Sequence, residues 1–236
     1  MAGQGRVRLL ARLMAGEGDL DTARLGEACA EATLMSGAGV MLMSDDVPVG
    51  SLCTTDDVSA LIEELQFALG EGPCIDAFHQ DRPVLEPDLK EPQTLRWPAF
   101  SPQVIDAGGR AVFGFPLRQG KVHLGALNLY RDMPGTLSDD QHADALVMAD
   151  IVTQAVLLFQ ADAPPGQLAA ALEEGADLQY IAHQASGMVA AQLNISVGQA
   201  LIRLRAYAFG NDRPLRSVVE DVVARTLAFD AESGRL

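Results

Sequence analysis

The sequence predicts an α+β domain with an antiparallel sheet flanked by helices, followed by an all-α bundle of three helices. Two observations support this prediction. Up to residue 160, helical spacing of apolar residues alternates with short β-branched and aromatic runs, in the order helix, two strands, helix, two strands, helix. Beyond Ala163-Pro164-Pro165-Gly166, which cannot continue a helix, all apolar patterns are helical. A chain of 236 residues is therefore expected to form two domains.

The first predicted elements are a helix and a hairpin. Residues 21–34 place apolar or small side chains on one helix face, and Gly37 follows as a stop. Two short apolar runs, Val40–Met43 and Val49–Thr54, flank the turn at Asp45-Asp46. Such a pattern is typical of an antiparallel hairpin.

The next predicted elements are a helix and an irregular segment. Asp56-Asp57 is expected to cap a helix that runs to Leu69, and Gly70 can adopt the left-handed conformation that ends it. Residues 83–100 are rich in proline and contain the only tryptophan. We expect this segment to be mostly irregular, with a short strand at Val84-Leu85.

The first domain is predicted to close with a second hairpin and a long helix. Residues 110–117 and 122–130 are β-branched, aromatic and apolar on both sides of a turn at 118–121. Ser138 then opens a helix from Asp139 to Phe159.

Three helices are predicted in the second domain. The first spans residues 168–193 with an interruption at Gly175, the second spans 197–209 after the cap Ser196, and the third spans 214–229. The expected domain limits are an N-terminal extension over 1–19, the α+β domain over 20–160, a linker over 161–175 and the helical domain over 176–230.

The acidic composition argues against a general nucleic-acid-binding protein, because phosphate binding uses lysine and arginine. The net charge is −15, but it is uneven. Residues 1–163 hold 11 basic and 24 acidic side chains, whereas residues 180–229 hold five arginines and three acids, a net charge of +2. The C-terminal region is thus compatible with nucleic-acid binding.

Several other classes of protein are disfavoured. No apolar run approaches the ~20 residues that cross a bilayer, and no signal-peptide pattern is present, so we expect a cytoplasmic protein. The three cysteines show no metal-ligand spacing, and the four histidines are scattered, so we expect neither a metal site nor catalytic residues. The residues concerned are Cys29, Cys53, Cys74, His79, His123, His142 and His183.

The C-terminal region resembles the ANTAR family, which binds RNA through three helices. The matching segments are Gln184–Val189, Ser196–Ala200, Leu204–Ala208, Pro214-Leu215 and Val218-Val219. The family often has a lysine where this chain has Ser186, so one cation that can contact phosphate is missing. The resemblance implies a transcription antiterminator that binds paired stem-loops in nascent mRNA as a homodimer.

Seven residues of this region are candidates for RNA contact. Arginine can contact phosphates and bases as a planar fork, and tyrosine can stack on an unpaired base. A second interpretation is that the arginines are the solvated face of the bundle and Tyr207 a packing residue. The candidates are Gln184, Ser186, Arg203, Arg205, Tyr207, Arg213 and Arg216.

The first domain resembles the GAF sensor domains that precede ANTAR domains, over most of residues 20–160. The matching segments are Glu64–Phe67, Gly70–Cys74, Asp88-Leu89, Arg96–Pro98, Phe115–Leu117 and Leu124–Leu129. The resemblance implies a small ligand or protein partner bound between the sheet and residues 70–100; the sequence does not identify the ligand or any cofactor. Glu71, Cys74 and Trp97 are the candidate pocket residues, with Trp97 alternatively a core anchor.

Two other functions stay open at this point. The helices around Asn211-Asp212-Arg213 have the length of a DNA-binding helix-turn-helix, although Glu220 and Asp221 on the third helix would repel phosphates. A sensor whose second domain binds only proteins is a further alternative. A GAF-fold thiol reductase using Cys53 or Cys74 is the least favoured alternative, since the sequence shows no matched resolving pair.

Overall fold

The computed structural model describes residues 22–44, 47–91, 96–162, 177–211 and 213–229. The chain divides into two compact units, and the main part of the second begins at Ala176. The predicted N-terminal extension and most of the predicted linker, with its break at Gly175, lie outside the described residues.

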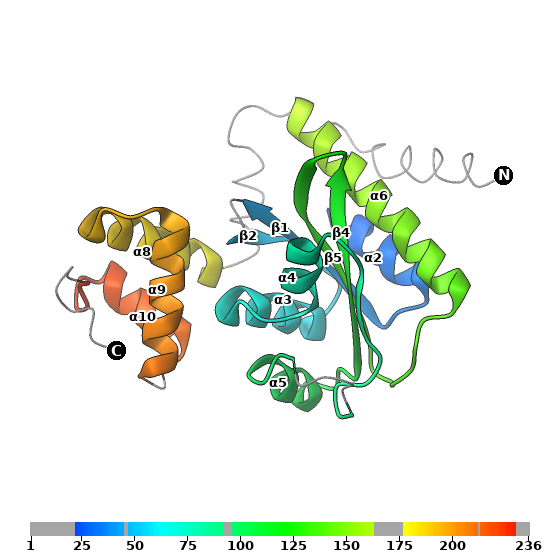
Figure 1. Cartoon of the computed structure of the whole chain (residues 1–236), viewed down its shortest axis with the longest axis horizontal. Coiled ribbons are helices and arrows are strands. Elements are labelled where there is room, and N and C mark those ends of the chain that lie inside the picture. The colour runs from blue at the N-terminus through cyan, green and yellow to red at the C-terminus, as the bar shows by residue number, and fades with distance from the viewer. Residues whose placement is uncertain (1–21, 45–46, 92–95, 163–176, 212, 230–236) are drawn as a thin grey trace. The chain divides into compact units, whose positions relative to one another are not determined.

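The first unit is built on one five-stranded antiparallel sheet with the strand order β2-β1-β5-β4-β3 (Figure 1). The two predicted hairpins occupy neighbouring places in it, because β1 pairs with β5, from Gly37↔Tyr130 to Leu42↔Gly125. The strands are β1 (Gly37–Ser44), β2 (Val47–Thr54), β3 (Val84–Glu86), β4 (Ala111–Gln119) and β5 (Val122–Arg131).

Helices cover both faces of this sheet. On one face lie α2 (Thr22–Thr33) and α6 (Asp139–Asp162), which contact each other and β1, β4 and β5. Helices α3 (Asp57–Leu69), α4 (Pro73–Gln80) and α5 (Phe100–Asp106) lie toward the other face, where α3 contacts β1 and α4 contacts β4 and β5. This arrangement is the α+β fold that the sequence predicts.

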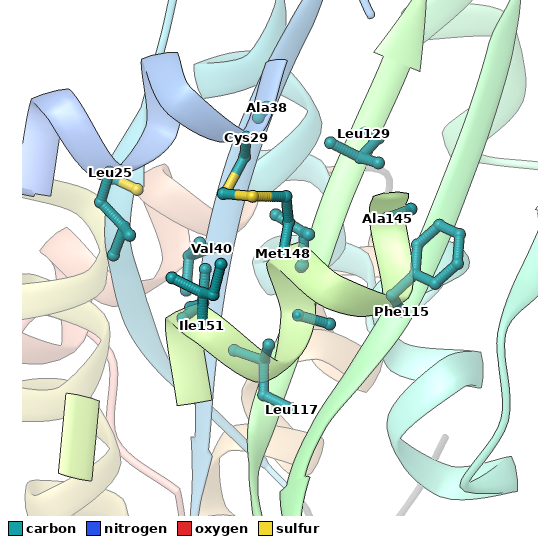
Figure 2. Packing of buried hydrophobic residues seen from close by; sticks show 14 of the residues in the cluster. Leu25, Cys29, Ala38, Val40, Phe115, Leu117, Leu129, Ala145, Met148 and Ile151 are labelled. Carbon is teal, nitrogen blue, oxygen red and sulfur yellow. The ribbon is translucent and has the colours of Figure 1, made fainter. Parts of the chain in front are cut away.

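The buried side chains between the sheet and helices α2 and α6 are mainly hydrophobic, and the buried hydroxyl groups of Thr33 and Thr153 donate to carbonyl groups of their own helices. Figure 2 shows side chains of both helices meeting those of β1, β4 and β5, including Cys29, Val40, Phe115 and Met148. Helix α6 is long and apolar enough to span a membrane, contrary to our expectation that no apolar run approaches the length needed to cross a bilayer. Its buried residues belong to this core, however, as expected for the core helix of a globular domain.

The predicted caps at Asp56 and Gly70 are confirmed, whereas the predicted stop at Gly37 is wrong, because the first helix ends at Thr33, Leu34 takes the left-handed conformation and Gly37 is the first residue of β1. The sequence pattern also did not predict two short helices. Asp56 accepts a hydrogen bond from the Ser59 amide at 2.7 Å, and Gly70 has a φ of 68°. Helix α4 begins at Pro73, a residue pre-organised for a first turn, and α5 lies at the end of the proline-rich segment. Both are at most eight residues long, too short for a periodic pattern to stand out.

The second unit contains α8 (Asp177–Leu193), α9 (Val197–Gly210) and α10 (Leu215–Val223), which contact one another pairwise. Small buried residues such as Ala182, Ala185 and Ala200 let the helix axes approach closely. The predicted end of the third helix near Phe229 is wrong. The chain turns away at Arg225, with a φ of 61°, and the amides of Thr226 and Leu227 both donate to the Asp221 carbonyl.

Candidate functional site

A row of three residues crosses the sheet beneath α3 and α4. Asn128 of β5 is paired with Gly39 of β1 on one side and with Gly114 of β4 on the other. A Cβ atom on Gly39 would lie 2.5 Å from Oε1 of Glu63, and one on Gly114 would overlap the backbone of Pro73. Glycine at both places therefore lets α3 and the start of α4 come down onto the strands beside Asn128.

Glu63 of α3 is a buried carboxyl group without a salt-bridge partner among the described residues. Its exposed fraction is 1%, and neither carboxylate oxygen makes a well-formed hydrogen bond to another described residue. The same holds for Oδ1 of Asn128 and Nε2 of Gln66, both of which are also buried. Burial raises the pKa of Glu63 to about 8, and the neighbouring Asn128 amide partly offsets this.

Gln66 and Cys74 connect α3 to α4. Oε1 of Gln66 accepts a hydrogen bond from the backbone amide of Cys74 at 2.7 Å. Burial raises the pKa of the Cys74 thiol well above its ordinary value, and the charge of Glu63 raises it further. The same two causes raise the pKa of Cys53 to about 12. Both cysteines are therefore thiols near neutral pH, which disfavours their use as nucleophiles.

The other predicted pocket residues, Glu71 and Trp97, form hydrogen bonds that connect the region of α4 with the region of α5. Oε2 of Glu71 accepts from the amides of Ala99 and Phe100, at 3.1 and 3.4 Å, where α5 begins. Trp97 has an exposed fraction of 6% and donates from Nε1 to Oδ2 of Asp76 of α4 at 3.1 Å. The burial of Trp97 and its hydrogen bond fit the interpretation of this residue as a core anchor. None of the contacts of Glu71 and Trp97 tests ligand binding.

In the second unit, α9 carries two of the predicted RNA-contact arginines and no acidic residue. Arg203 is exposed, whereas Arg205 is partly buried, which lowers its pKa to about 10. Tyr207 is also partly buried and packs edge-on against Phe229, with ring centroids 5.3 Å apart. Arg203 is thus the more accessible cation of the helix.

The remaining candidates differ in how free they are to contact RNA. Arg213 forms an ion pair with Asp221 at 2.6 Å and donates to Oγ of Ser217. Arg216 lies 4.0 Å from Glu220 on the exposed side of α10. Gln184 is exposed on α8.

Ser186 requires a correction. Its exposed fraction is 0%, and it lies beside Ala185 on the buried side of α8. A side chain in this position cannot touch RNA without opening the bundle, so Ser186 does not belong to the contact set. The family resemblance placed it there by position in the motif, which carries no information on burial.

Three exposed apolar residues of α9, namely Val197, Ile202 and Phe209, were missed by the sequence reasoning. Ile202 and Phe209 have exposed fractions of 59% and 83%. Their seven-residue spacing on one side of the helix, away from the core residues Leu201, Leu204 and Ala208, was the signal that could have found them. We define the α9 surface as the exposed residues Ile202, Arg203, Ala206 and Phe209.

Comparisons with known proteins address the first unit. Residues 22–156 match the family model described as GAF domain. No curated protein sequence matches the chain.

Three solved structures illustrate the similarity. The GAF domain of a phosphoenolpyruvate-protein phosphotransferase from Coxiella burnetii is 13% identical, over 67% of this chain and 96% of that one, with a TM-score of 0.49. Free methionine-R-sulfoxide reductase from Neisseria meningitidis is 15% identical, over 65% and 87%, with a TM-score of 0.46. The chromophore-binding domain of a bacteriophytochrome from R. palustris is 12% identical, over 68% and 62%, with a TM-score of 0.46. At these scores the similarities carry no argument about activity.

Proposed function

The chain belongs to the GAF domain family, and from this premise we propose that its sensor domain controls RNA binding by the second unit, which acts as an ANTAR-type bundle. Residues 20–160 are assigned to the sensor and residues 176–230 to the RNA-binding domain. The motif resemblance from Gln184 to Val219 supports this assignment. The presence of three mutually packed helices there is compatible with it.

The observation that carries the proposal is the α9 surface. It combines a cation, Arg203, with an exposed ring, Phe209, and a small residue, Ala206, between them. Nucleotides in RNA loops are recognised by this combination, since arginine contacts phosphates and unstacked bases lie on aromatic side chains. Helix α9 itself has no acidic residue, so no carboxylate on this helix would repel a bound phosphate.

The proposed action is transcription antitermination in the cytoplasm. Binding of paired stem-loops in a nascent transcript would hold the RNA in a form that excludes the terminator hairpin. Paired loops suit a homodimer, and the exposed residues Leu146, Val147 and Leu158 of α6 supply an apolar surface for one.

No catalytic step is assigned to the chain. The enzymatic alternative, thiol reduction, would need an accessible thiolate, and Cys53 and Cys74 are buried with raised pKa values. The open alternatives are therefore duplex DNA or a protein as the partner of the second unit.

The test is crosslinking of the full chain to nucleic acid in cells, followed by sequencing. Wild type should enrich leader transcripts with twin stem-loops next to terminators. Arg203→Ala should reduce that enrichment at least tenfold, because a charged contact to RNA is lost. Lys121→Ala, which removes an exposed cation from the β4–β5 turn, is the charge-matched control and should behave as wild type. Enrichment of duplex DNA, or of nothing, would move the function to promoter or protein binding.

A further inference from the structure

Asp221 of α10 accepts hydrogen bonds from the chain segments on both sides of this helix. Oδ2 of Asp221 accepts from Nη2 of Arg213, which lies in the connection between α9 and α10, at 2.6 Å. Oδ1 accepts from the hydroxyl of Thr226 at 3.1 Å, and the Asp221 carbonyl accepts from the amides of Thr226 and Leu227. One acidic residue thus joins the segment before α10 to the turn after it.

Arg213 is held by further contacts. Its Nη2 also donates to Oγ of Ser217 at 2.7 Å, and its backbone amide donates to the Ala208 carbonyl at 2.9 Å. The hydrogen bond to Asp221 raises the pKa of Arg213, and a hydrogen bond with Tyr207 contributes to this. The same bond from Arg213 lowers the pKa of Asp221. Both groups are therefore charged near neutral pH, and the guanidinium group has a defined orientation.

We infer that Asp221 is a positioning residue for RNA binding, which holds the guanidinium group of Arg213 in the orientation that contacts an RNA phosphate. The inference rests on the proposed function and adds a contact outside the α9 surface. A guanidinium group has five N–H donors on three nitrogen atoms. The bonds to Asp221 and Ser217 use Nη2, and the side chain of Arg213 is 32% exposed. Arg213 can therefore bind Asp221 and a phosphate at the same time.

The acidic residue itself needs an explanation at this place. A free carboxylate on a surface that binds RNA would repel phosphates. A purely structural role is a weak reason for it, because ion pairs between partly exposed groups contribute little to stability. A positioning role accounts for the charge, since Arg213 neutralises Asp221 and is itself oriented before RNA binds. A pre-oriented planar fork loses less conformational entropy on binding.

The experiment is filter binding of the full chain to the leader transcript that crosslinking enriches most. Asp221→Asn should bind this RNA about fivefold more weakly than wild type, because the charge that orients Arg213 is lost. Asparagine keeps an oxygen that can accept from Thr226, and the backbone bonds of the turn do not involve the side chain. If Asp221 only repelled RNA, the same variant would bind more tightly. Equal or tighter binding therefore overturns the inference.

The adjacent acid of α10 provides the matched control. Glu220 lies 4.0 Å from Arg216 and is exposed, so Glu220→Gln should keep the affinity within about twofold of wild type. A loss in Glu220→Gln as large as that in Asp221→Asn would show that any acid on this helix has the same effect, and would overturn the positioning role.

A double-mutant cycle tests whether Asp221 acts through Arg213. Arg213→Ala should weaken RNA binding about tenfold, because a charged hydrogen bond is lost. Asp221→Asn should cause no further loss in that variant, since a positioning residue has no effect once the residue that it positions is gone. A second loss of about fivefold in the double variant contradicts the inference.

The salt dependence of binding separates a lost phosphate contact from a general loss of structure. The slope of log affinity against log salt concentration should decrease by about one in Asp221→Asn and in Arg213→Ala alike. An unchanged or steeper slope in Asp221→Asn overturns the inference. If circular dichroism shows that Asp221→Asn does not fold, Arg213→Lys decides instead. Lysine keeps the charge and lacks the fork, so RNA binding should weaken about fivefold, and wild-type affinity would overturn the inference.

Failure of this inference is distinguishable from failure of the proposed function. If Arg203→Ala lowers the enrichment of the transcript while Asp221→Asn binds it as wild type does, only the positioning role is wrong. If wild type enriches no RNA, the proposed function is wrong and the positioning role is wrong with it.

Discussion

The two faces of the sheet differ in the polarity of the side chains buried on them. Under α2 and α6, the buried cluster consists of aliphatic, aromatic and sulfur-containing side chains, such as Phe115, Leu129 and Val152. Under α3, α4 and α5, the cluster around Trp97 and Phe100 is interrupted by Glu63, Gln66 and Asn128. Since desolvated polar groups destabilise a fold, the first face supplies stability and the second carries features that stability alone does not explain.

The largest effect is expected on the hydrophobic face. Phe115→Ala should lower the free energy of unfolding by about 3–5 kcal/mol, because it removes a fully buried ring and leaves a cavity against α6. Urea unfolding followed by circular dichroism measures this. Phe115→Leu, which retains most of the volume, should cost less than half as much. A small loss in Phe115→Ala would mean that this face is not the stabilising one.

The polar face should respond in the opposite direction. Glu63→Gln should raise the free energy of unfolding at pH 7 by about 3 kcal/mol, because the variant has no carboxyl group to keep protonated. The pKa of Glu63 is raised on folding, so the contribution of this group to stability is fully present below about pH 4.5 and is lost as the pH rises toward about 8.

Urea midpoints from pH 4.5 to pH 8 check this prediction. The wild-type curve should fall more steeply than that of Glu63→Gln, and Glu64→Gln should follow wild type. Parallel curves for wild type and Glu63→Gln would show that Glu63 is paired or hydrated, and would remove the contrast between the faces.

A smaller effect on the free energy of unfolding is expected at Trp97, a residue of the polar face whose side chain is hydrogen-bonded. Trp97→Phe keeps a ring against Phe100, with which Trp97 packs edge-on at 5.8 Å, but loses the hydrogen bond to Asp76. The expected loss is about 1 kcal/mol in the free energy of unfolding. Thermal unfolding of the full chain measures it. A loss as large as that of Phe115→Ala would indicate that Trp97 anchors the α4–α5 segment by much more than one hydrogen bond.

The smallest effect on stability is expected at the α9 surface. Phe209→Ala should change the free energy of unfolding by no more than about 0.5 kcal/mol, because the ring is largely exposed. If the proposed function is right, the same variant should weaken RNA binding by about 1–3 kcal/mol through loss of stacking. Filter binding to a transcript found by crosslinking measures this, and Phe209→Tyr should retain binding. Unchanged affinity in Phe209→Ala would exclude the ring from the interface.

The sequence by itself determined the elements with strong local signals. Both hairpins, the capped helix between them and the long helix from Asp139 follow from apolar periodicity and from residues such as Asp56 and Gly70, whose capping geometry is local. The family match over residues 22–156 then places these elements in the GAF fold. The short helices α4 and α5 could not be predicted in this way, because eight residues or fewer form too few turns to show a helical periodicity of apolar residues.

Only the tertiary structure decided which polar residues are buried and what they meet. Glu63 and Glu64 are adjacent acids on one helix, and nothing local distinguishes the buried one from the exposed one. Ser186 stands at a motif position where the family often has a lysine, yet the packing of α8 buries it. Burial depends on residues distant in the chain, since Glu63 owes its surroundings to Gly39 and Asn128. Contacts of this kind arise from chain topology, which short-range periodicity does not encode.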